Sequence, residues 1–294
     1  MARPGDLVTP HGHLVAAQAQ AALTLEDRLG TLGTLGTLAP LERDAAAAFC
    51  AAHPPRAGAP LAVVIPAYNE EATVADVVRQ IPSRAAELDL EVIVVCDGAV
   101  DATAARARAA GALVCDVPVN RGQGAALRLG YALARVRGAQ IICTIDADDQ
   151  YDPGEIATVV RPILDGDADF VSGSRRLGAE LTTDRTRHLG VVVFGAILTA
   201  LTGHRITDPA CGLRAMRAEV TAAVTLEQPQ YQASELQISA ALHGYRLAEV
   251  PTTMRDRGLH AGTTKKGGNF GYGVRFARAA VQTWWRDRHA SRAR

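Results

Sequence analysis

The sequence predicts an α/β protein whose central sheet is mostly parallel and carries helices on both faces. Between residues 61 and 145, apolar runs that read as buried strands alternate with amphipathic helical segments. This alternation is typical of parallel strands joined by helices. Polar and acidic side chains follow directly after the runs. Such sheets bind their ligands beyond the carboxyl ends of the strands, so these side chains are the candidate site.

Length and composition are those of a soluble globular protein of one or two domains. The chain has 294 residues, of which 48% are hydrophobic and 21% charged, with 31 basic and 31 acidic side chains. This composition excludes a disordered chain, and zero net charge argues against a dedicated nucleic-acid-binding protein. The five cysteines form no Cys-x-x-Cys pair, which favours the cytoplasm over a disulfide-forming compartment. No signal peptide is expected, and residues 189–203 form an apolar stretch too short to span a membrane.

The elements are expected in a regular order. Residues 1–58 form a helical arm, packed on the main domain or on a partner subunit, which leaves a homo-oligomer open; a disordered leader is the alternative. Further on, residues 189–201 are a core helix or a wall that contacts a lipid chain, and a last helix covers 272–288. The regular part in between has expected strands at 61–65, 91–95, 112–117 and 141–145 and helices at 73–81, 102–110 and 124–135.

The fourth expected strand ends in the acidic segment Asp146-Ala-Asp148-Asp-Gln150. Two carboxylates one residue apart at the end of a buried strand repel each other. A divalent cation with oxygen ligands, Mg²⁺ or Mn²⁺, completed by a diphosphate would compensate this charge. An acidic turn that caps the helix starting near Pro153 is the plainer interpretation.

Six blocks together resemble inverting family-two glycosyltransferases of the GT-A fold, especially the dolichyl- and polyprenyl-phosphate sugar synthases. The likeness covers residues 60–270 and implies a Rossmann-like GT-A catalytic domain over 59–262, with a nucleotide-sugar half at 59–180 and an acceptor half at 181–262. Residues 263–294 then form the end of a lid and a basic, amphipathic C-terminal helix. The blocks are VIPAYNEE (64–71), VVCDGAVDAT (94–103), NRGQGAAL (120–127), DADDQ (146–150), GSR (173–175) and TDPACGLR (207–214).

The resemblance implies a role for particular residues toward a nucleotide-diphosphate sugar. Asp97 would contact the base, and Asp146 would lie near the ribose and diphosphate. The metal would be held by Asp146, Asp148 and Gln150, with Asp148 also counted as catalytic. One departure stands out: related enzymes carry two acids before the glycine, whereas this chain has Cys96 first and then Asp97. The remaining nucleotide-sugar residues would be Pro66, Tyr68, Glu70 and Gly122.

The second half contains residues that could serve either of two kinds of acceptor. For a polyprenyl phosphate, Arg175 would face the acceptor phosphate, with Arg185 and Arg187 nearby as further cations or as a solvated basic surface. For a soluble hydroxyl acceptor, a general base is required. Asp208 and Glu235 are the candidates, and either could cap a helix instead.

Two cations are expected on a lid that closes over the diphosphate. Related synthases have a loop of the type Arg-x-x-Gly-x-Ser-Lys, and Lys265 fits its end. The spacing back to Arg257 is two residues too long, which leaves Arg255 as the alternative. A basic surface loop is the competing interpretation.

The formal charge is divided between the two parts of the chain. Residues 265–294 contain eight basic residues and one acidic residue, so they carry +7 while the first 264 residues carry −7. Trp284 and Trp285 stand among arginines in the last helix, which suits the interface of an anionic membrane or an ordinary packed helix. A cytoplasmic enzyme, peripheral at the inner face of the membrane, follows from the first interpretation.

The preferred function is therefore metal-dependent, inverting sugar transfer to a polyprenyl phosphate. Transfer to a soluble hydroxyl acceptor is the alternative, including a retaining enzyme related to the glucosyl-phosphoglycerate synthases. Nucleotidyl transfer would require a basic Gly-rich loop after the first strand, where residues 66–71 are acidic instead. The remaining hypothesis is a non-catalytic scaffold whose basic tail binds a membrane or another protein.

Overall fold

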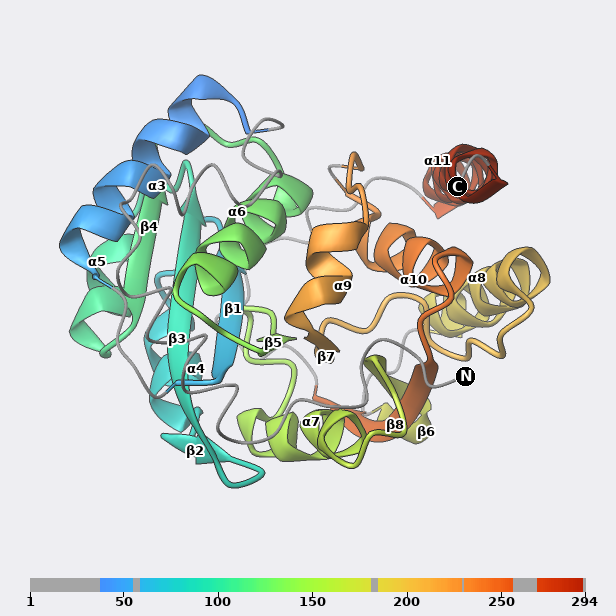
Figure 1. Cartoon of the computed structure of the whole chain (residues 1–294), viewed down its shortest axis with the longest axis horizontal. Coiled ribbons are helices and arrows are strands. Elements are labelled where there is room, and N and C mark those ends of the chain that lie inside the picture. Colours follow the sequence, from blue (N-terminus) through green and yellow to red (C-terminus); the bar gives the residue numbers. More distant parts are fainter. Residues whose placement is uncertain (1–37, 55–58, 181–184, 229, 256–268, 293–294) are drawn as a thin grey trace, which may run out of the picture.

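The computed structural model describes residues 38–54, 59–180, 185–228, 230–255 and 269–292. Within these ranges the chain folds around one curved, mixed sheet with helices on both faces (Figure 1). The strands are β1 (Leu61–Ala67), β2 (Arg84–Ala85), β3 (Leu88–Asp97), β4 (Leu113–Val117), β5 (Ile141–Thr144), β6 (Phe170–Glu180), β7 (Arg214–Arg217) and β8 (Leu247–Met254). The helices are α3 (Pro40–Ala52), α4 (Val74–Gln80), α5 (Thr103–Ala109), α6 (Gln123–Val136), α7 (Ile156–Leu164), α8 (Arg185–Thr202), α9 (Ala218–Ala223), α10 (Gln232–Leu242) and α11 (Asn269–Arg292), with a 3-10 turn at Pro153–Glu155.

The strand order is β2-β3-β1-β5-β7-β6-β8. β4 pairs with the carboxyl half of β3, on the side away from β1. The pairs β3–β4, β3–β1 and β1–β5 are parallel, as expected, and β6–β8, between two strands that were not predicted, is parallel as well. β7 runs antiparallel to both of its neighbours, β5 and β6. The prediction of a mostly parallel sheet is therefore confirmed for the first half, and β7, together with the two-residue β2 antiparallel to β3, makes the complete sheet mixed.

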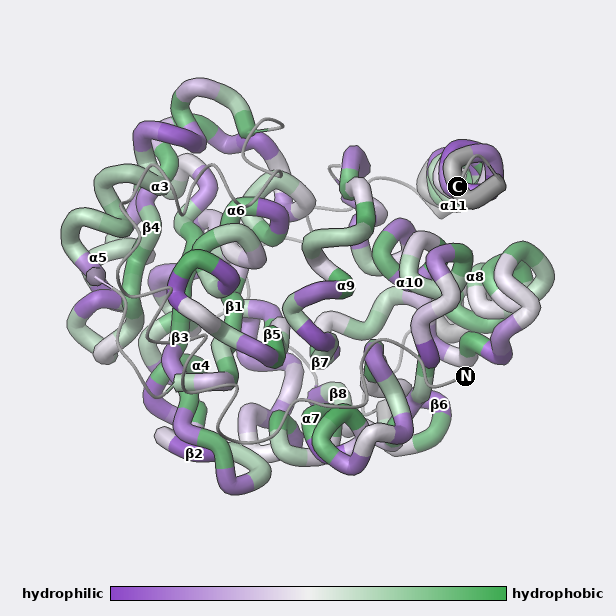
Figure 2. Tube along the Cα trace, in the orientation of Figure 1, coloured by the Kyte–Doolittle hydropathy of each residue, from purple (hydrophilic) through white to green (hydrophobic). Residues whose placement is uncertain are grey.

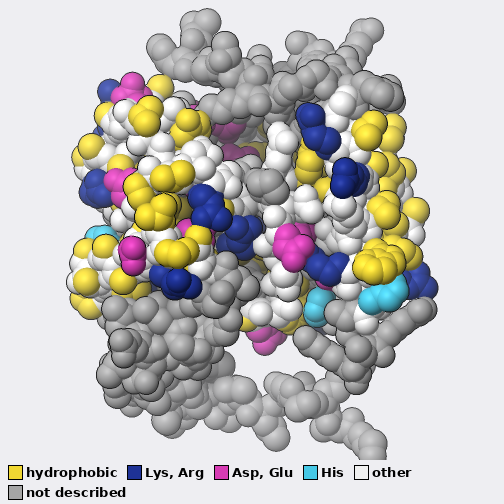
Figure 3. All heavy atoms as spheres, turned by 90° about the horizontal axis from the view of Figure 1, so that it is seen from above, with side chains coloured by type: hydrophobic (Ala, Val, Ile, Leu, Met, Phe, Trp, Pro, Cys, Tyr) yellow, Lys and Arg dark blue, Asp and Glu magenta, His cyan; other side chains and the backbone are white. Residues whose placement is uncertain are grey.

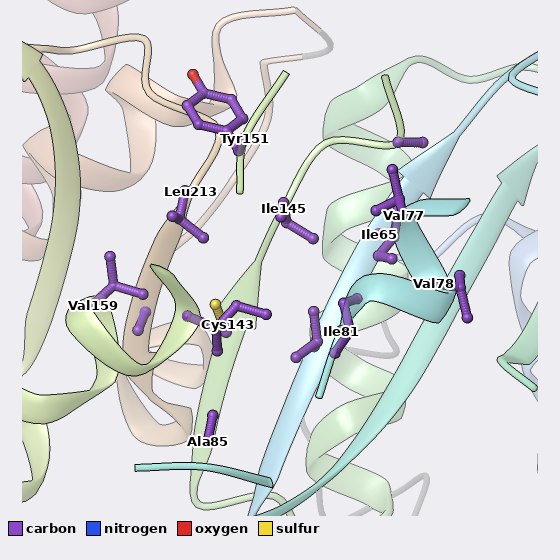
Figure 4. Packing of buried hydrophobic residues seen from close by; sticks show 14 of the residues in the cluster. Ile65, Val77, Val78, Ile81, Ala85, Cys143, Ile145, Tyr151, Val159 and Leu213 are labelled. Carbon is purple, nitrogen blue, oxygen red and sulfur yellow. The ribbon is translucent and has the colours of Figure 1, made fainter. Parts of the chain in front are cut away.

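Strand β1 is buried along its whole length, because helices cover it on both faces. On one face, side chains of β1 and β5 pack against α4 and α7 (Figure 4). On the other face they pack against α3, α6, α9 and α10. Continuous apolar strands of this kind are typical of a sheet buried on both sides, and Figure 2 shows hydrophobic residues running through these central strands.

Helix α3 lies within the N-terminal block of residues 1–58, for which the sequence predicts a helical arm. Its buried side chains, including Phe49, lie against β4 and α6. Arg137 at the end of α6 donates to the carbonyl oxygens of His53 and Pro54 and forms a bidentate pair with Glu91. The described part of the block is therefore packed on the main domain.

A third cluster joins the C-terminal helix α11 to α8 and α10. Phe276 of α11 stacks on Phe194 of α8 with ring centroids 3.9 Å apart, and the edge of Tyr231 meets it at 5.8 Å. In Figure 1 these helices lie on the opposite side of the molecule from α3 and α5. No described helix is long and apolar enough to cross a bilayer.

Candidate active site at the carboxyl ends of the strands

The loops that follow β1, β3 and β5 are joined by hydrogen bonds into one edge. The backbone N–H of Glu70, after β1, donates to the hydroxyl of Thr103, after β3, at 2.8 Å. The hydroxyl of Thr73 donates to the carbonyl oxygen of Ala147, between the two acids after β5, at 2.7 Å. Pro66 is buried within β1, while Tyr68 and Glu70 are half-buried just beyond it. The structure therefore brings the expected nucleotide-sugar residues of these loops together.

Asp97 ends β3 and fixes the loop before α6. Its side chain is buried and accepts hydrogen bonds from the backbone N–H groups of Arg121 at 2.9 Å and Gly122 at 2.7 Å. Burial raises the pKa of Asp97, and these two hydrogen bonds oppose the rise. Gly98 has φ of +69°, and a Cβ there would lie 2.2 Å from the backbone nitrogen of Asn120. Asp97 and Gly98 thus determine how closely the two loops approach, and the contact of Asp97 with a base stays a prediction.

Cys96 occupies the position at which related enzymes carry the first acid. Its side chain is fully buried in the core on the α4 side of the sheet, and burial raises the pKa of its thiol to about 12. Asp97 follows it on the strand and therefore points to the other face. The residue that departs from the family pattern, Cys96, therefore lies inside the core and not at the candidate site.

Asp146 is held in place at the end of β5. It is half-buried and accepts a hydrogen bond of 3.0 Å from the side-chain amide of Gln123, at the start of α6. A Cβ at Gly212 would lie 2.1 Å from its carboxylate. The hydroxyl of Tyr151 accepts from the backbone N–H of Gly212 at 3.0 Å. The segment before β7 thus lies directly against Asp146. It can do so because residue 212 is a glycine and has no side chain.

Asp148 and Gln150 have different surroundings. Asp148 is half-buried on the same turn as Asp146, and accepts the backbone N–H of Gln150 at 3.4 Å. Gln150 is 4% exposed, and its side-chain amide donates to the carbonyl oxygen of Arg255 at 3.3 Å. Among the described residues, no three acidic, histidine or cysteine side chains converge as a ready-made metal site. A cation bound by these two carboxylates would need oxygen atoms from a ligand, and the metal role of Gln150 stays a prediction.

Arg255 connects the end of β8 to the acidic segment. Its backbone N–H donates to the carbonyl oxygen of Gln150 at 2.7 Å, and its guanidinium pairs with Asp152 at 2.6 Å. Both partners of this pair are about 40% exposed, at 42% and 40%. Arg255 is therefore a described cation beside the candidate site. Arg257 and Lys265 lie outside the described residues, as do the side chains of Arg185 and Arg187.

Arg175 and Asp208 form a buried, bidentate ion pair. Nε and Nη2 of Arg175 lie 2.5 and 2.6 Å from the two carboxylate oxygens, and the side chains are 1% and 0% exposed. Burial alone would lower the pKa of Arg175, but the hydrogen bond and charge of Asp208 hold it above its usual value. Arg175 therefore does not face an open acceptor site in this structure, in contrast to the expectation from the sequence. The carboxylate of Asp208 is likewise committed to Arg175, so it is not presented to an acceptor hydroxyl.

Glu249 of β8 supports this pair, although no sequence motif marks it. Its carboxylate accepts from the backbone N–H of Thr207 at 2.9 Å, from the Thr207 hydroxyl at 2.8 Å and from the backbone N–H of Asp208 at 3.0 Å. The hydroxyl groups of Ser174 and Thr207 are 2.6 Å apart. The conformation of the Thr207–Asp208 turn is thus set by β6 and β8.

Glu235 lies in the first turn of α10 and is bonded to the preceding loop and to α11. It is 2% exposed and accepts from the backbone N–H groups of Glu227 and Gln228 at 2.9 and 2.8 Å and from Arg286 at 3.0 Å. Burial raises its pKa, which these hydrogen bonds oppose. Glu235 therefore joins the preceding loop to α11, and a role as general base stays a prediction that these contacts do not favour.

Comparisons with known proteins agree with this architecture. Residues 62–225 match the family described as glycosyl transferase family 2. A dolichyl-phosphate hexose transferase of Haloferax volcanii is 33% identical over 205 residues, which cover 70% of this chain and 86% of that protein. A UDP-N-acetylglucosamine–dolichyl-phosphate N-acetylglucosaminyltransferase of Methanococcus voltae is 28% identical over 64% of this chain and 83% of its own length.

Among solved structures, the chain is similar to glucosyl-3-phosphoglycerate synthase of Mycobacterium tuberculosis in complex with Mn²⁺, UDP and phosphoglyceric acid. The TM-score is 0.59 at 25% identity, over 82% of this chain and 81% of that one. The same enzyme is matched in complex with Mg²⁺ and UDP. With the family match covering more than half of the residues and the fold similar to that of a solved glycosyltransferase, the chain belongs to glycosyl transferase family 2 and is a nucleotide-sugar-dependent glycosyltransferase.

Proposed function

We propose that this protein transfers a sugar from a nucleotide diphosphate to a polyprenyl phosphate, with inversion and with a divalent metal ion. The observation that carries the proposal is the single edge at which Asp97, Asp146 and Asp148 follow the strands of a family 2 domain. Two relatives are named as transferases that act on dolichyl phosphate, which supports a lipid phosphate as the acceptor.

The donor set supports Mg²⁺ or Mn²⁺. Asp146 and Asp148 offer carboxylate oxygens, which hard divalent cations prefer, and such cations bind through one or two carboxylates together with substrate phosphates. Because Gly212 has no side chain, the backbone beside the Asp146 carboxylate leaves space that a Cβ would fill. When bound, the metal would neutralise charge on the leaving diphosphate. Gln150 has a more direct task in anchoring Arg255 beside this segment.

The proposed reaction needs no general base. An oxygen of the acceptor phosphate forms a bond to the anomeric carbon, while the bond from that carbon to the diphosphate oxygen breaks and its electron pair leaves with the nucleoside diphosphate. Because the attacking phosphate is already anionic, no proton has to be removed. The enzyme must place the two reactants in line and stabilise the leaving group. Arg255, a described cation bonded to the acidic segment through Gln150 and Asp152, is proposed to stabilise the leaving group, with Arg257 and Lys265 assisting it.

The exposed face of α11 supports a site at the cytoplasmic surface of an anionic membrane. Five exposed residues recur at intervals of three and four, so they lie on one side of the helix. The stripe contains both basic and hydrophobic side chains, and Figure 3 shows both kinds together on the part of the surface where α11 lies. Such a face suits the headgroup region of a bilayer. The stripe consists of Val274, Arg278, Val281, Trp285 and Arg288.

A phosphorylated soluble acceptor is the second candidate. The matched synthase structure is described with phosphoglyceric acid and covers more of this chain, 82%, than the Haloferax relative, 70%. A retaining enzyme would follow from that likeness. The two candidates share the donor site and differ in the acceptor and in the configuration of the product.

Both candidates can be tested in one experiment. Purified protein is incubated with a panel of nucleotide-diphosphate sugars and Mn²⁺, with either polyprenyl phosphate in detergent or 3-phosphoglycerate, and products are identified by mass spectrometry and by the anomeric coupling in NMR. We expect a polyprenyl-phosphate sugar of inverted configuration, and loss of product in EDTA. Product with phosphoglycerate alone would establish the second candidate. Metal-independent turnover would contradict the role of Asp146 and Asp148.

A further inference from the structure

Arg214, the first residue of β7, is buried without a bound carboxylate. Its side chain is among the largest fully buried ones and is 2% exposed. Nε and Nη1 have no hydrogen-bond partner among the described residues. A buried cation in this state costs free energy, because it has left water without gaining an equivalent contact. A residue with that cost calls for a compensating role.

The register of the sheet places Arg214 beneath Asp146. Arg214 pairs with Thr144, two residues before Asp146 on β5. Gly212, two residues before Arg214, lies against the Asp146 carboxylate, and its carbonyl oxygen accepts from the Thr144 hydroxyl at 3.0 Å. Side chains two residues apart on a strand share a face, about 7 Å apart. Arg214 therefore lies on the face of the sheet below Asp146, the first of the two acids.

The surroundings of Arg214 contain other polar groups that are incompletely bonded. Tyr131 of α6 is 1% exposed, and its hydroxyl has no hydrogen-bond partner among the described residues. Burial raises the pKa of Tyr131 to about 12, while Arg214 opposes the rise and Asp146 adds to it. The phenol therefore lies within electrostatic range of both charges. Ser172 also pairs with Arg214, and it accepts from the amide of Gln237 at 3.3 Å.

We infer that Arg214 is a positioning residue for the donor, whose buried positive charge offsets Asp146 and Asp148 so that a diphosphate can approach them. Without it, two carboxylates would repel the anionic donor before a cation neutralises them. The interaction acts across protein interior and is screened less than a surface charge. This inference rests on the proposed function, since it concerns the same donor site.

The test uses inorganic pyrophosphate, which avoids the unknown base, and measures its affinity calorimetrically with and without Mn²⁺. Arg214→Met removes the charge and keeps an unbranched side chain about as long as the aliphatic stem of arginine. We expect pyrophosphate to bind at least about tenfold more weakly, with the larger loss in EDTA. The melting temperature should stay equal or rise, because the variant removes an unpaired buried cation. A merely structural arginine would give the reverse, a lower melting temperature and unchanged affinity.

Three further variants complete the design. Arg214→Lys should keep affinity within about threefold of wild type, because the charge is retained. Tyr131→Phe should leave pyrophosphate affinity unchanged. Arg217→Met is the matched control, because Arg217 lies on the same strand but pairs with Asp169. It should also leave pyrophosphate affinity unchanged. If Arg214→Met does not fold, Arg214→Gln replaces it, since its amide suits a site beside Gln237.

The failure of this inference is distinguishable from failure of the proposed function. Unchanged pyrophosphate affinity in a folded, neutral Arg214 variant overturns the inference alone. Absence of pyrophosphate and nucleotide binding in the wild-type protein, with and without Mn²⁺, contradicts both. Weaker binding with retained stability, restored by lysine, establishes the positioning role.

Discussion

The contact between Arg175 and Asp208 gives the sharpest prediction for a single residue. Asp208→Ala leaves the guanidinium of Arg175 buried without its bidentate partner. An uncompensated buried charge typically costs about 3–5 kcal/mol of unfolding free energy. We expect that loss in urea unfolding of Asp208→Ala.

The double variant Arg175→Met/Asp208→Ala is the control for this prediction. It removes both charges, so it should be more stable than Asp208→Ala alone, and the cycle should give a coupling of a few kcal/mol. A loss below about 1 kcal/mol in Asp208→Ala would contradict the buried pair. It would instead fit the expectation from the sequence, in which Arg175 and Asp208 face the acceptor separately.

Gly212 gives a second prediction, which concerns activity more than stability. A Cβ at this position would lie 2.1 Å from the Asp146 carboxylate, so Gly212→Ala must displace that side chain. We expect kcat/KM to fall by about tenfold or more, since small displacements of catalytic groups have large effects. Gly190→Ala in α8, where a Cβ meets only Phe194 at 3.9 Å, should retain activity. Equal activity of both variants would show that Asp146 does not need its observed position.

At this scale the sequence identified residue types and loops but not all partners. The motifs located Asp97, Asp146 and Asp148 correctly at strand ends, because the carboxyl edge of a parallel sheet follows from the alternation of strands and helices. They did not reveal that Arg175 binds Asp208, 33 residues later. Glu249 carries no motif, and its role depends on the pairing of β6 with β8. Long-range partners of this kind are properties of the folded sheet.

At the scale of elements, Asp169 joins the ends of β6, β7 and β8, and it predicts a dependence of stability on pH. It accepts two side-chain hydrogen bonds and one backbone hydrogen bond from Arg246, and pairs with Arg217. The hydrogen bond from the Arg246 side chain, despite partial burial, holds the pKa of Asp169 below its ordinary value. Its stabilisation is therefore present above the unfolded pKa of about 3.9 and is lost as the pH falls.

We expect Asp169→Asn to cost about 1–2 kcal/mol at pH 7, and the difference from wild type to shrink below about pH 4. Urea unfolding at a series of pH values measures both curves. Asp76→Asn is the control, because Asp76 forms an exposed pair with Arg79 on α4 and should show only the small effect of a surface ion pair. A constant difference across the pH range would mean that the Asp169 charge is not what holds these strands.

The alternating first half of the fold was predictable, whereas the second half was not. Each strand expected between residues 61 and 145 is present as β1, β3, β4 or β5, because continuous apolar runs need burial on both faces. β7 is four residues long and begins with the buried Arg214. A short strand with charged ends has no strong periodic signal. β6 and β8 likewise contain polar residues whose partners lie in other elements.

At the scale of the whole molecule, the division between an acidic body and a basic tail predicts how the protein meets a membrane. Helix α11 is held by its inner face, where Arg286 pairs with Glu235 of α10 and with Glu227 in the loop before it. Its outer stripe keeps Trp285 61% exposed between Val281 and Arg288. A surface attraction of this kind combines insertion of apolar side chains with charge that salt screens.

We therefore expect the full chain to sediment with vesicles of phosphatidylglycerol and phosphatidylcholine, and much less with phosphatidylcholine alone. Raising the salt from 0.1 M to 1 M shortens the screening length from about 10 Å to about 3 Å and should release most of the protein. Val281→Ser/Trp285→Ser should weaken binding at low salt without changing turnover of a short-chain, detergent-dispersed acceptor. Leu41 of α3, 44% exposed on the opposite side of the molecule from α11, provides the control as Leu41→Ser. Binding that ignores both lipid charge and these two α11 residues would mean that the acidic body, and not this helix, meets the acceptor's membrane.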